Sequence, residues 1–372
     1  MKSFYISCGG TGGHLAPGIS LAEGLMEKGH RCSLFISQKE VDSRLVRKYS
    51  NLIFNKVPSA PFSLSPIRFI RFLVQQTKAF LYYLFEFNKN RPDTLIAFGG
   101  FCSLGSVLAA SFTKTPIVLH EANRFPGKAI RLLSGKASRV YLPKGITHQS
   151  IPQNIVKNCG YPLRKEITKI PKAIAREQIG VKAKGKLLVI IGGSQGADTL
   201  NQWVLSNFSN LSEAGINVYC VTGLKNEIKG ELQNQSLETN LKFVPFTDQM
   251  AAVLSSADLV ISRAGAGGIS EIVRCRVPNI LIPYPHAADN HQEKNARHLE
   301  KTGCSIVVPQ EKIDTLFREV TDTINNTWLI DKFCSNLKNV DSENSLEIIL
   351  DDLESISDKK DLKVTSTKGD RA

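Results

Sequence analysis

Four glycines stand directly after the first predicted strand of the chain. The strand covers residues 3–7, and Cys8-Gly9-Gly10-Thr11-Gly12-Gly13-His14 leads from it into a helix predicted over residues 15–28. Glycines at such a turn bring bare backbone N–H groups to a helix N-terminus, which is a binding site for an anionic group. Pro17 stands in the first helical turn, where its missing N–H costs nothing. We therefore expect an α/β fold with an anion site at this turn.

The turn matches neither of the two common nucleotide-binding motifs. A dinucleotide fingerprint in the register Gly10-x-Gly12 would need Gly or Ala where Leu15 stands, and a P-loop would need a following Gly-Lys-Ser/Thr. His14 is a titratable side chain that the turn places at the mouth of the predicted site. Acid–base chemistry and a structural role within the turn are the two interpretations of this residue.

The composition predicts a soluble, two-domain protein of a reducing compartment. The chain has 372 residues, of which 42% are apolar, so it can bury a core in each of two domains. Its eight cysteines show no Cys-x-x-Cys or Cys/His ligand spacing, which argues against a zinc site. Met1 leads within three residues into the first strand, without a signal peptide, and we therefore expect a cytoplasmic location.

Positive charge is concentrated in the first half of the chain. Residues 1–160 hold 21 Lys or Arg and 7 Asp or Glu, a net charge of +14, whereas residues 161–372 have a net charge of −1. A one-sided basic domain indicates a polyanionic partner, either nucleic acid or an anionic membrane surface. The alternative is a solvating charge that is spread evenly over the surface.

A predicted helix over about 67–87 is apolar on two sides, whereas an ordinary surface helix has one apolar stripe. The side that we expect to be buried against the sheet holds Ile67, Ile70, Val74, Leu81 and Leu84. The second side holds Phe69, Leu73, Phe80, Tyr83 and Phe87. With Arg68, Arg71 and Lys78 interleaved, the second side predicts a surface that dips into a bilayer interface without spanning it. Burial between neighbouring helices is the alternative.

Two further strands of the first half also end in glycine or polar residues. The strand over residues 94–98 leads to a second glycine turn at residues 99–103, and the strand over 117–119 ends at His120-Glu121-Ala122-Asn123. Open α/β sheets bind ligands at the carboxyl ends of their strands. We expect His120, Glu121 and Asn123 to line the same cleft as His14, the alternative being that each caps the next turn.

The pattern stops near Gly160-Tyr161-Pro162-Leu163-Arg164 and then begins again. The strand over residues 186–191 ends in Gly192-Gly193-Ser194-Gln195-Gly196-Ala197, and a helix follows. We predict two Rossmann-like domains, residues 1–160 and 161–340, facing each other across a cleft. A helix over about 342–356 should pack back on the first domain, and the charged segment 357–372 is expected to be disordered.

The second domain holds a further glycine-rich helix start. The strand over residues 259–262 leads into Arg263-Ala264-Gly265-Ala266-Gly267-Gly268-Ile269-Ser270-Glu271. An anion at the helix N-terminus, with a carboxylate one turn further on, suits a nucleoside diphosphate whose ribose hydroxyls donate to Glu271. After the strand over 279–282, residues 289–295 are dense in the groups that bind sugar hydroxyls.

Taken together, these motifs resemble the MurG family of bacterial cell-wall glycosyltransferases, which belongs to glycosyltransferase family 28. The match covers residues 10–310 through the first glycine turn, His120-Glu121-x-Asn123, Gly160-x-Pro162-x-Arg164 and the two glycine turns of the second domain. The resemblance implies a GT-B fold of two doubly wound parallel sheets. It also implies transfer of N-acetylglucosamine (GlcNAc) from UDP-GlcNAc to the C4 hydroxyl of the muramyl sugar of lipid I, giving lipid II with inversion at the anomeric carbon.

The resemblance assigns site residues position by position. Within the donor site it places the diphosphate at Arg164 and Ser194, uracil at Phe246 and Thr247, the α-phosphate at Ala266, Gly267, Gly268 and Ile269, ribose at Glu271, and the GlcNAc at Gln292 and Asn295. The first domain would reach the same donor through Thr11, Gly12, Gly13 and Asn123. His14 is the implied general base.

The chain departs from the family pattern at three places. Gly268 stands where the family has Thr, so a hydroxyl donor to phosphate is lost, and Ala122 replaces a Gln. Residues 101–104 differ from the family's Tyr-Val-Ser-x-Pro, and the last two departures concern the acceptor side.

No Asp-x-Asp pair occurs in the chain, and we expect neither a metal nor a cofactor. Helix N-termini and Arg164 would neutralise the leaving UDP, and inversion needs a base but no protein nucleophile. The resemblance further implies a peripheral location on the cytoplasmic face of the inner membrane, contact through residues 67–87, no nucleic-acid partner, and association with other cell-wall synthesis proteins. A GT-B transferase for another lipid acceptor and a UDP-sugar epimerase are the alternative enzymes.

Overall fold

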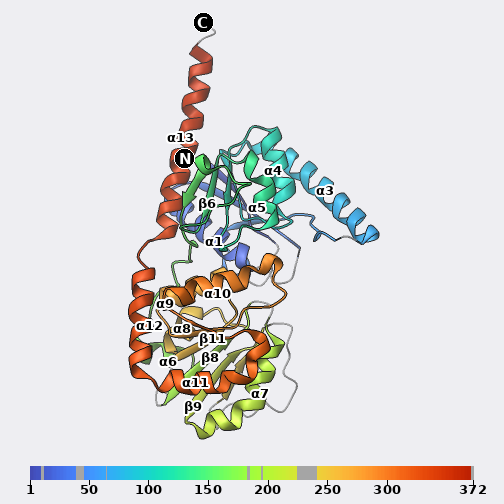
Figure 1. Ribbon diagram of the computed structural model, residues 1–372. Helices are drawn as coiled ribbons and strands as arrows, with labels where there is room; N and C mark the ends of the chain where they lie inside the picture. Colours follow the sequence, from blue (N-terminus) through green and yellow to red (C-terminus); the bar gives the residue numbers. More distant parts are fainter. Residues whose placement is uncertain are drawn as a thin grey trace. The chain divides into compact units, whose positions relative to one another are not determined.

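The computed structural model describes residues 1–9, 12–38, 46–63, 65–181, 185–193, 196–223 and 241–369 (Figure 1). The chain divides into two compact units, one of residues 1–164 together with the residues from Asn344 onward, the other of Lys165–Glu343. The division therefore lies after Arg164 rather than at residue 160, so that Arg164 belongs to the first unit.

The first unit is built on a parallel sheet, which has seven strands among the described residues, in the order β3-β2-β1-β4-β5-β6-β7. The strands are β1 (Ser3–Ser7), β2 (Arg31–Ile36), β3 (Ile53–Lys56), β4 (Thr94–Ala97), β5 (Ile117–His120), β6 (Arg139–Leu142) and β7 (Val156–Asn158). Its helices are α1 (Gly12–Glu27), α3 (Pro66–Asn90), α4 (Ser103–Phe112), α5 (Lys128–Leu133), α13 (Ser345–Gly369) and the 3-10 turns η1 (Ser134–Lys136) and η2 (Gln153–Ile155).

Each face of this sheet has its own apolar core, because successive side chains of a strand point to opposite faces. Phe4 and Ile6 of β1 lie in a cluster with α1 and α13, whereas Tyr5 lies in a second cluster with α3, α4 and α5. Strands that are covered on both faces read as continuous apolar runs, as β1 does.

The second unit repeats this construction. Its parallel sheet has six strands among the described residues, in the order β10-β9-β8-β11-β12-β13. The strands are β8 (Lys186–Ile191), β9 (Ile216–Val221), β10 (Leu241–Val244), β11 (Leu259–Ser262), β12 (Asn279–Leu281) and β13 (Ile306–Val307). The helices are α6 (Lys172–Gln178), α7 (Asp198–Glu213), α8 (Met250–Ser256), α9 (Ala266–Cys275), α10 (His291–Lys301), α11 (Leu316–Asn325), α12 (Thr327–Val340), η4 (Ala288–Asn290) and η5 (Gln310–Thr315). Two parallel sheets with covering helices confirm the predicted α/β class.

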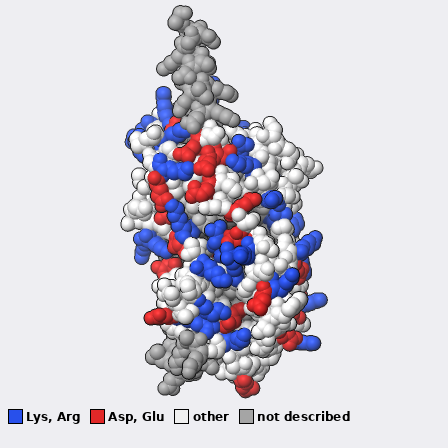
Figure 2. All heavy atoms as spheres, turned by 90° about the vertical axis from the view of Figure 1, so that its left-hand side faces the viewer, with Lys and Arg blue, Asp and Glu red and all other residues white. Residues whose placement is uncertain are grey.

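The C-terminal helix α13 packs on the first unit through α1. Leu346, Ile349, Leu350 and Leu353 are buried in the cluster that α1 contributes to. Asp352 accepts a hydrogen bond from the hydroxyl of Tyr141 at 2.8 Å and pairs with Arg139 and Lys157. Figure 2 shows acidic and basic side chains interspersed on this face, and part of the basic charge of the first unit is thus paired.

The sequence predicted a disordered segment from residue 357, and α13 continues past that residue to Gly369. The apolar pattern ends near Ile356, but the loss of an apolar face does not by itself end a helix. Lys and Leu extend one readily, whereas Gly terminates it.

The prediction of which side of α3 is buried against the sheet is wrong. Ile67 is 82% exposed, Ile70 61% and Leu81 56%, whereas the buried residues of the helix are Gln76, Ala79, Tyr83 and Phe87. The second half of the helix packs on α4, where Gly105 permits close approach: a Cβ built there would lie 3.0 Å from that of Ala79. The first turns project beyond the sheet of this unit (Figure 1), so both of their apolar sides meet solvent.

Across the described ranges, no helix has both the length and the apolar character to cross a membrane.

Candidate active site

The first unit brings His14 against the second glycine turn. His14 lies in the first turn of α1, after β1, and residues 99–101 follow β4, the neighbour of β1 in the sheet. A Cβ built on Gly100 would lie 3.1 Å from Cε1 and 3.4 Å from Nδ1 of His14. The second glycine turn thus lies beside the imidazole of His14, as neighbouring strand ends at the carboxyl edge of a parallel sheet allow.

The first glycine turn needs glycine for a reason beyond ligand access. A Cβ at Gly9 would lie 2.2 Å from the backbone N of Ser37, at the end of β2. Gly12 and Gly13 are the first residues of α1, and Thr11 lies outside the described residues.

His120 lies near His14 and is neutral at physiological pH. It is 2% exposed, and its Nε2 lies 3.2 Å from the carbonyl oxygen of Gly160. Burial lowers the pKa of His120 to about 4, opposed by the hydrogen bond to Gly160 and reinforced by the nearby His14. Because a carbonyl only accepts, Nε2 carries the proton of the neutral ring. The structure thus places His120 near His14, and a cleft that both residues line stays a prediction.

Glu121 stabilises its own loop. This corresponds to the alternative role that the sequence left open, in which the residue caps the next turn. Its Oε1 accepts from the backbone N and from Nδ2 of Asn123, at 2.9 and 2.8 Å, and its Oε2 accepts from Gly127 N at 2.7 Å. With 7% exposure the carboxylate is committed to these bonds. Asn123 is held by Glu121 at the carboxyl end of β5.

The segment 160–164 packs on the start of α1. Tyr161 donates its hydroxyl to the carbonyl oxygen of Gly13 at 3.3 Å, and Ser20 donates to that of Leu163 at 2.7 Å. Arg164 is 9% exposed and its Nη1 donates to the hydroxyl of Tyr49 at 3.2 Å. This predicted diphosphate ligand is thus held in the first unit.

In the second unit α9 begins where the predicted phosphate site lies. Gly265 is its N-cap, and the bond from Ile269 N to Gly265 O, 3.0 Å long, closes the first turn. A helix start leaves its first N–H groups without intrahelical partners and carries partial positive charge. Ala266, Gly267 and Gly268 supply these groups, and Glu271 lies further along the same helix.

Gln292 joins the loops that follow β11 and β12. Its Oε1 accepts from the backbone N of Ala264 at 3.2 Å and from that of Tyr284 at 2.9 Å. Asn295 is 4% exposed and its Nδ2 donates to Ala264 O at 3.1 Å. Asn295 therefore supports the loop that Gln292 also contacts. The Oε1 of Gln292 is occupied by two backbone N–H groups, and its Nε2 is the donor group of the side chain.

Arg263 is a buried residue shortly before the α9 start, and the sequence assigned no role to it. It is 8% exposed, its Nη1 donates to the carbonyls of Ile282 and Pro283 at 3.2 and 3.3 Å, and its Nη2 donates to Oε1 of Gln310 at 2.6 Å. Its guanidinium lies 5.5 Å from the ring centroid of Tyr284. Burial lowers the pKa of Arg263. An Arg directly before a glycine-rich helix start was the available signal.

The other predicted donor residues lie apart from this group. Phe246 and Thr247 follow β10, with Phe246 40% exposed and Thr247 Oγ1 accepting from Gln249 N at 3.0 Å. Ser194 lies outside the described residues.

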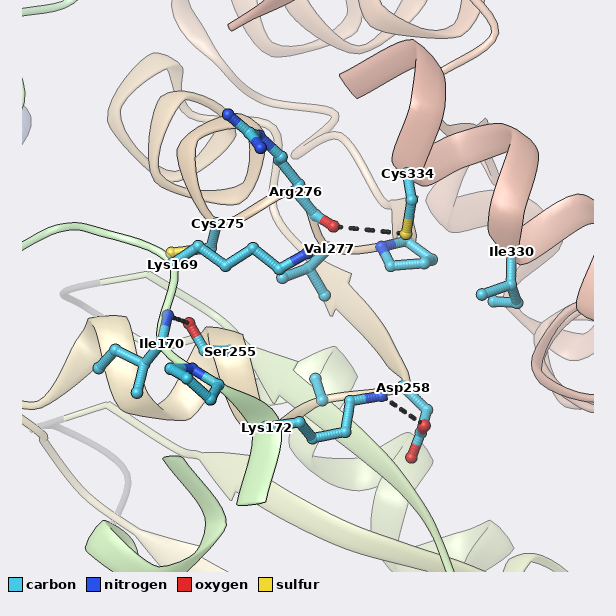
Figure 3. A pocket seen from close by; sticks show the side chains of 13 residues that line it. Lys169, Ile170, Lys172, Ser255, Asp258, Cys275, Arg276, Val277, Ile330 and Cys334 are labelled. Atoms are coloured by element: carbon cyan, nitrogen blue, oxygen red, sulfur yellow. Dashed lines mark hydrogen bonds and ion pairs between the residues drawn. The ribbon is translucent and has the colours of Figure 1, made fainter. Parts of the chain in front are cut away.

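A cavity of about 440 Å³ lies at the opposite, amino-terminal edge of the second sheet (Figure 3). Lys172 pairs there with Asp258 at 2.8 Å, and Cys334 Sγ lies 3.6 Å from the carbonyl oxygen of Arg276. None of the predicted site residues lines this cavity.

Two family models match the chain. The glycosyltransferase family 28 N-terminal domain matches residues 4–142, and the C-terminal domain of the same family matches residues 187–330. A relative from Opitutus terrae is 47% identical over 96% of this chain and 96% of its own length. The chain belongs to glycosyltransferase family 28, in the MurG group.

The names of the family 28 relatives agree with one another. The Opitutus terrae protein is named UDP-N-acetylglucosamine--N-acetylmuramyl-(pentapeptide) pyrophosphoryl-undecaprenol N-acetylglucosamine transferase. A Prochlorococcus marinus relative with the same name is 36% identical over 84% of each chain. The predicted family is confirmed.

Solved structures of similar fold include MurG of Acinetobacter baumannii, with a TM-score of 0.70 and 23% identity over 95% of this chain and all of that one. The UDP-GlcNAc 2-epimerase of Neisseria meningitidis has a TM-score of 0.66 and 14% identity over 95% of this chain and all of that one. These likenesses confirm the GT-B fold. Since a transferase and an epimerase share it, the fold alone does not separate the two activities.

Proposed function

We propose that this family 28 glycosyltransferase transfers GlcNAc from UDP-GlcNAc to N-acetylmuramyl-(pentapeptide) pyrophosphoryl-undecaprenol, lipid I, to form lipid II for peptidoglycan. The observation that carries this assignment is 47% identity along 96% of both chains with a relative that bears this name. The glycine turns, the start of α9 and the His14 environment supply chemistry that suits the reaction.

The second unit would hold the nucleotide sugar at the carboxyl edge of its sheet. The free N–H groups and the dipole of α9 favour a phosphate, and Glu271 would accept from the ribose hydroxyls. Gln292 has its amide oxygen committed to two backbone N–H groups, so its Nε2 would donate to a sugar hydroxyl. An amide fixed in this way selects acceptors, which hydroxyl oxygens provide.

We further propose that the transfer inverts the anomeric carbon with His14 as general base. His14 takes the proton of the C4 hydroxyl of the acceptor while the oxygen of that hydroxyl attacks the anomeric carbon of GlcNAc. The bond between the anomeric carbon and UDP breaks in the same step. A neutral His120 beside His14 adds no positive charge that would oppose proton uptake, because its pKa is lowered to about 4. The backbone of Gly100 limits the rotation of the imidazole.

The leaving diphosphate would be stabilised without a metal, by the N-terminus of α9. The support is the absence of an Asp-x-Asp pair from the sequence together with the glycine-rich start of α9. Transfer from UDP-GlcNAc in EDTA, with the product linkage assigned by NMR, tests both points. The β-linked product should form at an unchanged rate. Loss of turnover that Mg²⁺ restores would overturn the metal-free mechanism, and an α-linkage would overturn inversion.

We also propose that α3 docks on the membrane that holds the lipid acceptor. Its exposed apolar residues are Ile67, Phe69, Ile70, Leu73, Val74, Leu81 and Phe85. Arg68, Arg71 and Lys78 are exposed on the same helix, and each contributes about 1 kcal/mol near an anionic leaflet. Phe62, which is 60% exposed, packs its ring on Phe69 and Phe72 and extends this surface.

Vesicle binding of an Ile67→Ser/Ile70→Ser/Leu73→Ser protein tests this contact. Because all three side chains are exposed, the protein should melt like wild type yet bind vesicles of anionic phospholipid several-fold more weakly. It should keep its turnover of a short-chain soluble acceptor. Trp328→Ser, a change at a 71% exposed residue of the second unit, is the matched control. Unchanged vesicle binding by the triple variant would place the membrane contact elsewhere.

A further inference from the structure

Gln76 is a buried polar residue on the half of α3 that packs against the first unit. It is 8% exposed, and its Nε2 donates to the carbonyl oxygen of Phe101 at 2.9 Å. Its Oε1 is buried as well and accepts no hydrogen bond from the described part of the chain. A buried acceptor without a partner costs about 1–3 kcal/mol. An apolar side chain would therefore serve simple packing better at this position.

Phe101 belongs to the turn that lies against His14. Gly99 and Gly100 both have positive φ, +83° and +69°, and a Cβ on Gly100 would lie 3.1 Å from Cε1 of His14. Because Gly99 and Gly100 have no side chains, side-chain packing cannot fix the position of the turn. The place of the turn therefore depends on the hydrogen bonds to its carbonyl groups.

Among the described residues, three side chains donate hydrogen bonds to carbonyls of this turn. Ser103 Oγ donates to Gly99 O at 2.7 Å, and Ser7 Oγ donates to Cys102 O at 3.2 Å. Ser103 is part of the α4 start that forms the turn, and Ser7 ends β1. Gln76 adds the bond to Phe101 O, on the residue next to Gly100, from a different helix.

The half of α3 that carries Gln76 is rigidly backed. A Cβ on Gly105 of α4 would lie 3.0 Å from Cβ of Ala79, and Tyr83, one turn further on, is 1% exposed. Tyr83 also directs its hydroxyl to Ser7 Oγ at 3.5 Å. A side chain on such a support can hold a loop to within a fraction of an ångström, as a reacting group requires.

We propose that Gln76 is a positioning residue for His14. Its hydrogen bond to Phe101 O fixes the Gly99–Phe101 turn, and the turn fixes the imidazole in the orientation that accepts the proton of the acceptor hydroxyl. The inference rests on the proposed role of His14 as general base. It explains why α3 retains a buried amide whose oxygen has no partner in the described chain.

The Gln76→Met variant tests the proposal, since Met has a similar length and no hydrogen-bond donor. Removal of the unpaired oxygen offsets the loss of the hydrogen bond, so the melting temperature should equal or exceed that of wild type. The kcat for transfer to a short-chain lipid I analogue should fall about tenfold, because misplacement of a catalytic group by less than 1 Å has effects of this size. The KM for UDP-GlcNAc should not change. Thr77→Ala is the control, because Thr77 is exposed and bonds to Leu73 O of its own helix.

The Gln76→Glu variant supplies a pH-dependent measurement of kcat that a change in packing alone would not alter. The carboxyl group that this substitution introduces could donate to Phe101 O when protonated, and it could not when ionised. The ratio of the kcat of this variant to that of wild type at the same pH should therefore rise as the pH is lowered from 8 to 6. A ratio that stays constant would count against the hydrogen bond as the cause.

Two results would overturn the proposal. One is a Gln76→Met protein with the kcat of wild type, and the other is a loss of kcat that only follows a lower melting temperature. His14→Ala, measured alongside, separates this failure from failure of the base assignment. If His14→Ala keeps full activity, the base is another residue, whatever Gln76 does.

Discussion

The imidazole of His14 lies against the Cα of Gly100, so closely that a Cβ at that glycine would be 3.1 Å from Cε1. A side chain at this position would require the ring to move by a few tenths of an ångström, and the contact joins the ends of two adjacent strands, β1 and β4. The backbone of the second glycine turn thus limits where the ring can lie.

Gly100→Ala should lower kcat at least tenfold. The added methyl group displaces the imidazole, and the φ of +69° adds strain of about 1–2 kcal/mol. Gly29→Ala is the matched control, since Gly29 has a φ of +83° and nothing within 4 Å of its Cβ position. The control should lose stability but not kcat. Equal loss of kcat in both variants would show that backbone strain, not the contact with His14, is responsible.

Gly268→Thr should tighten UDP binding by about tenfold. A Cβ at Gly268 has room, its nearest neighbours being Ser262 Oγ at 3.9 Å and Arg263 O at 4.0 Å, and a hydroxyl in the first turn of α9 can donate to phosphate. A hydrogen bond to a charged group contributes about 1.5–3 kcal/mol. Calorimetric titration with UDP measures the effect, and Gly268→Ala separates the hydroxyl from the gain in helix propensity. Equal affinity of the Thr and Ala variants would place the phosphate elsewhere.

Glu271→Ala should raise the KM for UDP-GlcNAc about tenfold with little change in kcat. The proposed bonds to ribose are made equally in the ground state and the transition state. Glu271→Gln keeps an acceptor oxygen, so its KM for UDP-GlcNAc should lie between those of wild type and Glu271→Ala. A fall in kcat at unchanged KM would assign Glu271 to the reacting centre instead.

Acidification should destabilise the protein through His120. The pKa of its buried side chain is lowered from 6.5 to about 4, so the unfolded chain takes up a proton below pH 6.5 while the folded one remains neutral until about pH 4. The contribution of the neutral His120 side chain to the free energy of unfolding is fully present above pH 6.5. It declines by about 3 kcal/mol as the pH falls from 6.5 to 4. Urea unfolding of wild type and of His120→Gln over this range isolates it. Parallel pH profiles of the two proteins would exclude His120 as the cause.

The buried strands β1, β8 and β11 were predicted with their observed bounds, whereas β4 was predicted one residue too long, β5 one residue too short, and the buried strand β6 was not predicted. β1, β8 and β11 are largely apolar runs that no helix pattern fits, and a glycine-rich turn follows each of them. The three-residue strand β7, Val-Lys-Asn, was missed because its residues are half-buried or exposed and carry no such run.

The features that depend on distant parts of the chain could not be predicted. Which side of α3 is buried is decided by Gly105 on α4 and by how far the helix extends past the sheet, and neither is encoded in the helix itself. The contact of Gly100 with His14 joins residues far apart in the sequence. Glu121 was grouped with His14 by its strand end, but its bonds to Asn123 and Gly127 commit it to its own loop.

Release of UDP from UDP-GlcNAc, measured in EDTA with and without a lipid I analogue, tests the central claim most directly. We expect that UDP appears only when the acceptor is present, and that the His14→Ala variant releases UDP about 100-fold more slowly while its affinity for UDP remains that of wild type. Turnover of UDP-GlcNAc at the same rate without any lipid, as an epimerase would show, would contradict it.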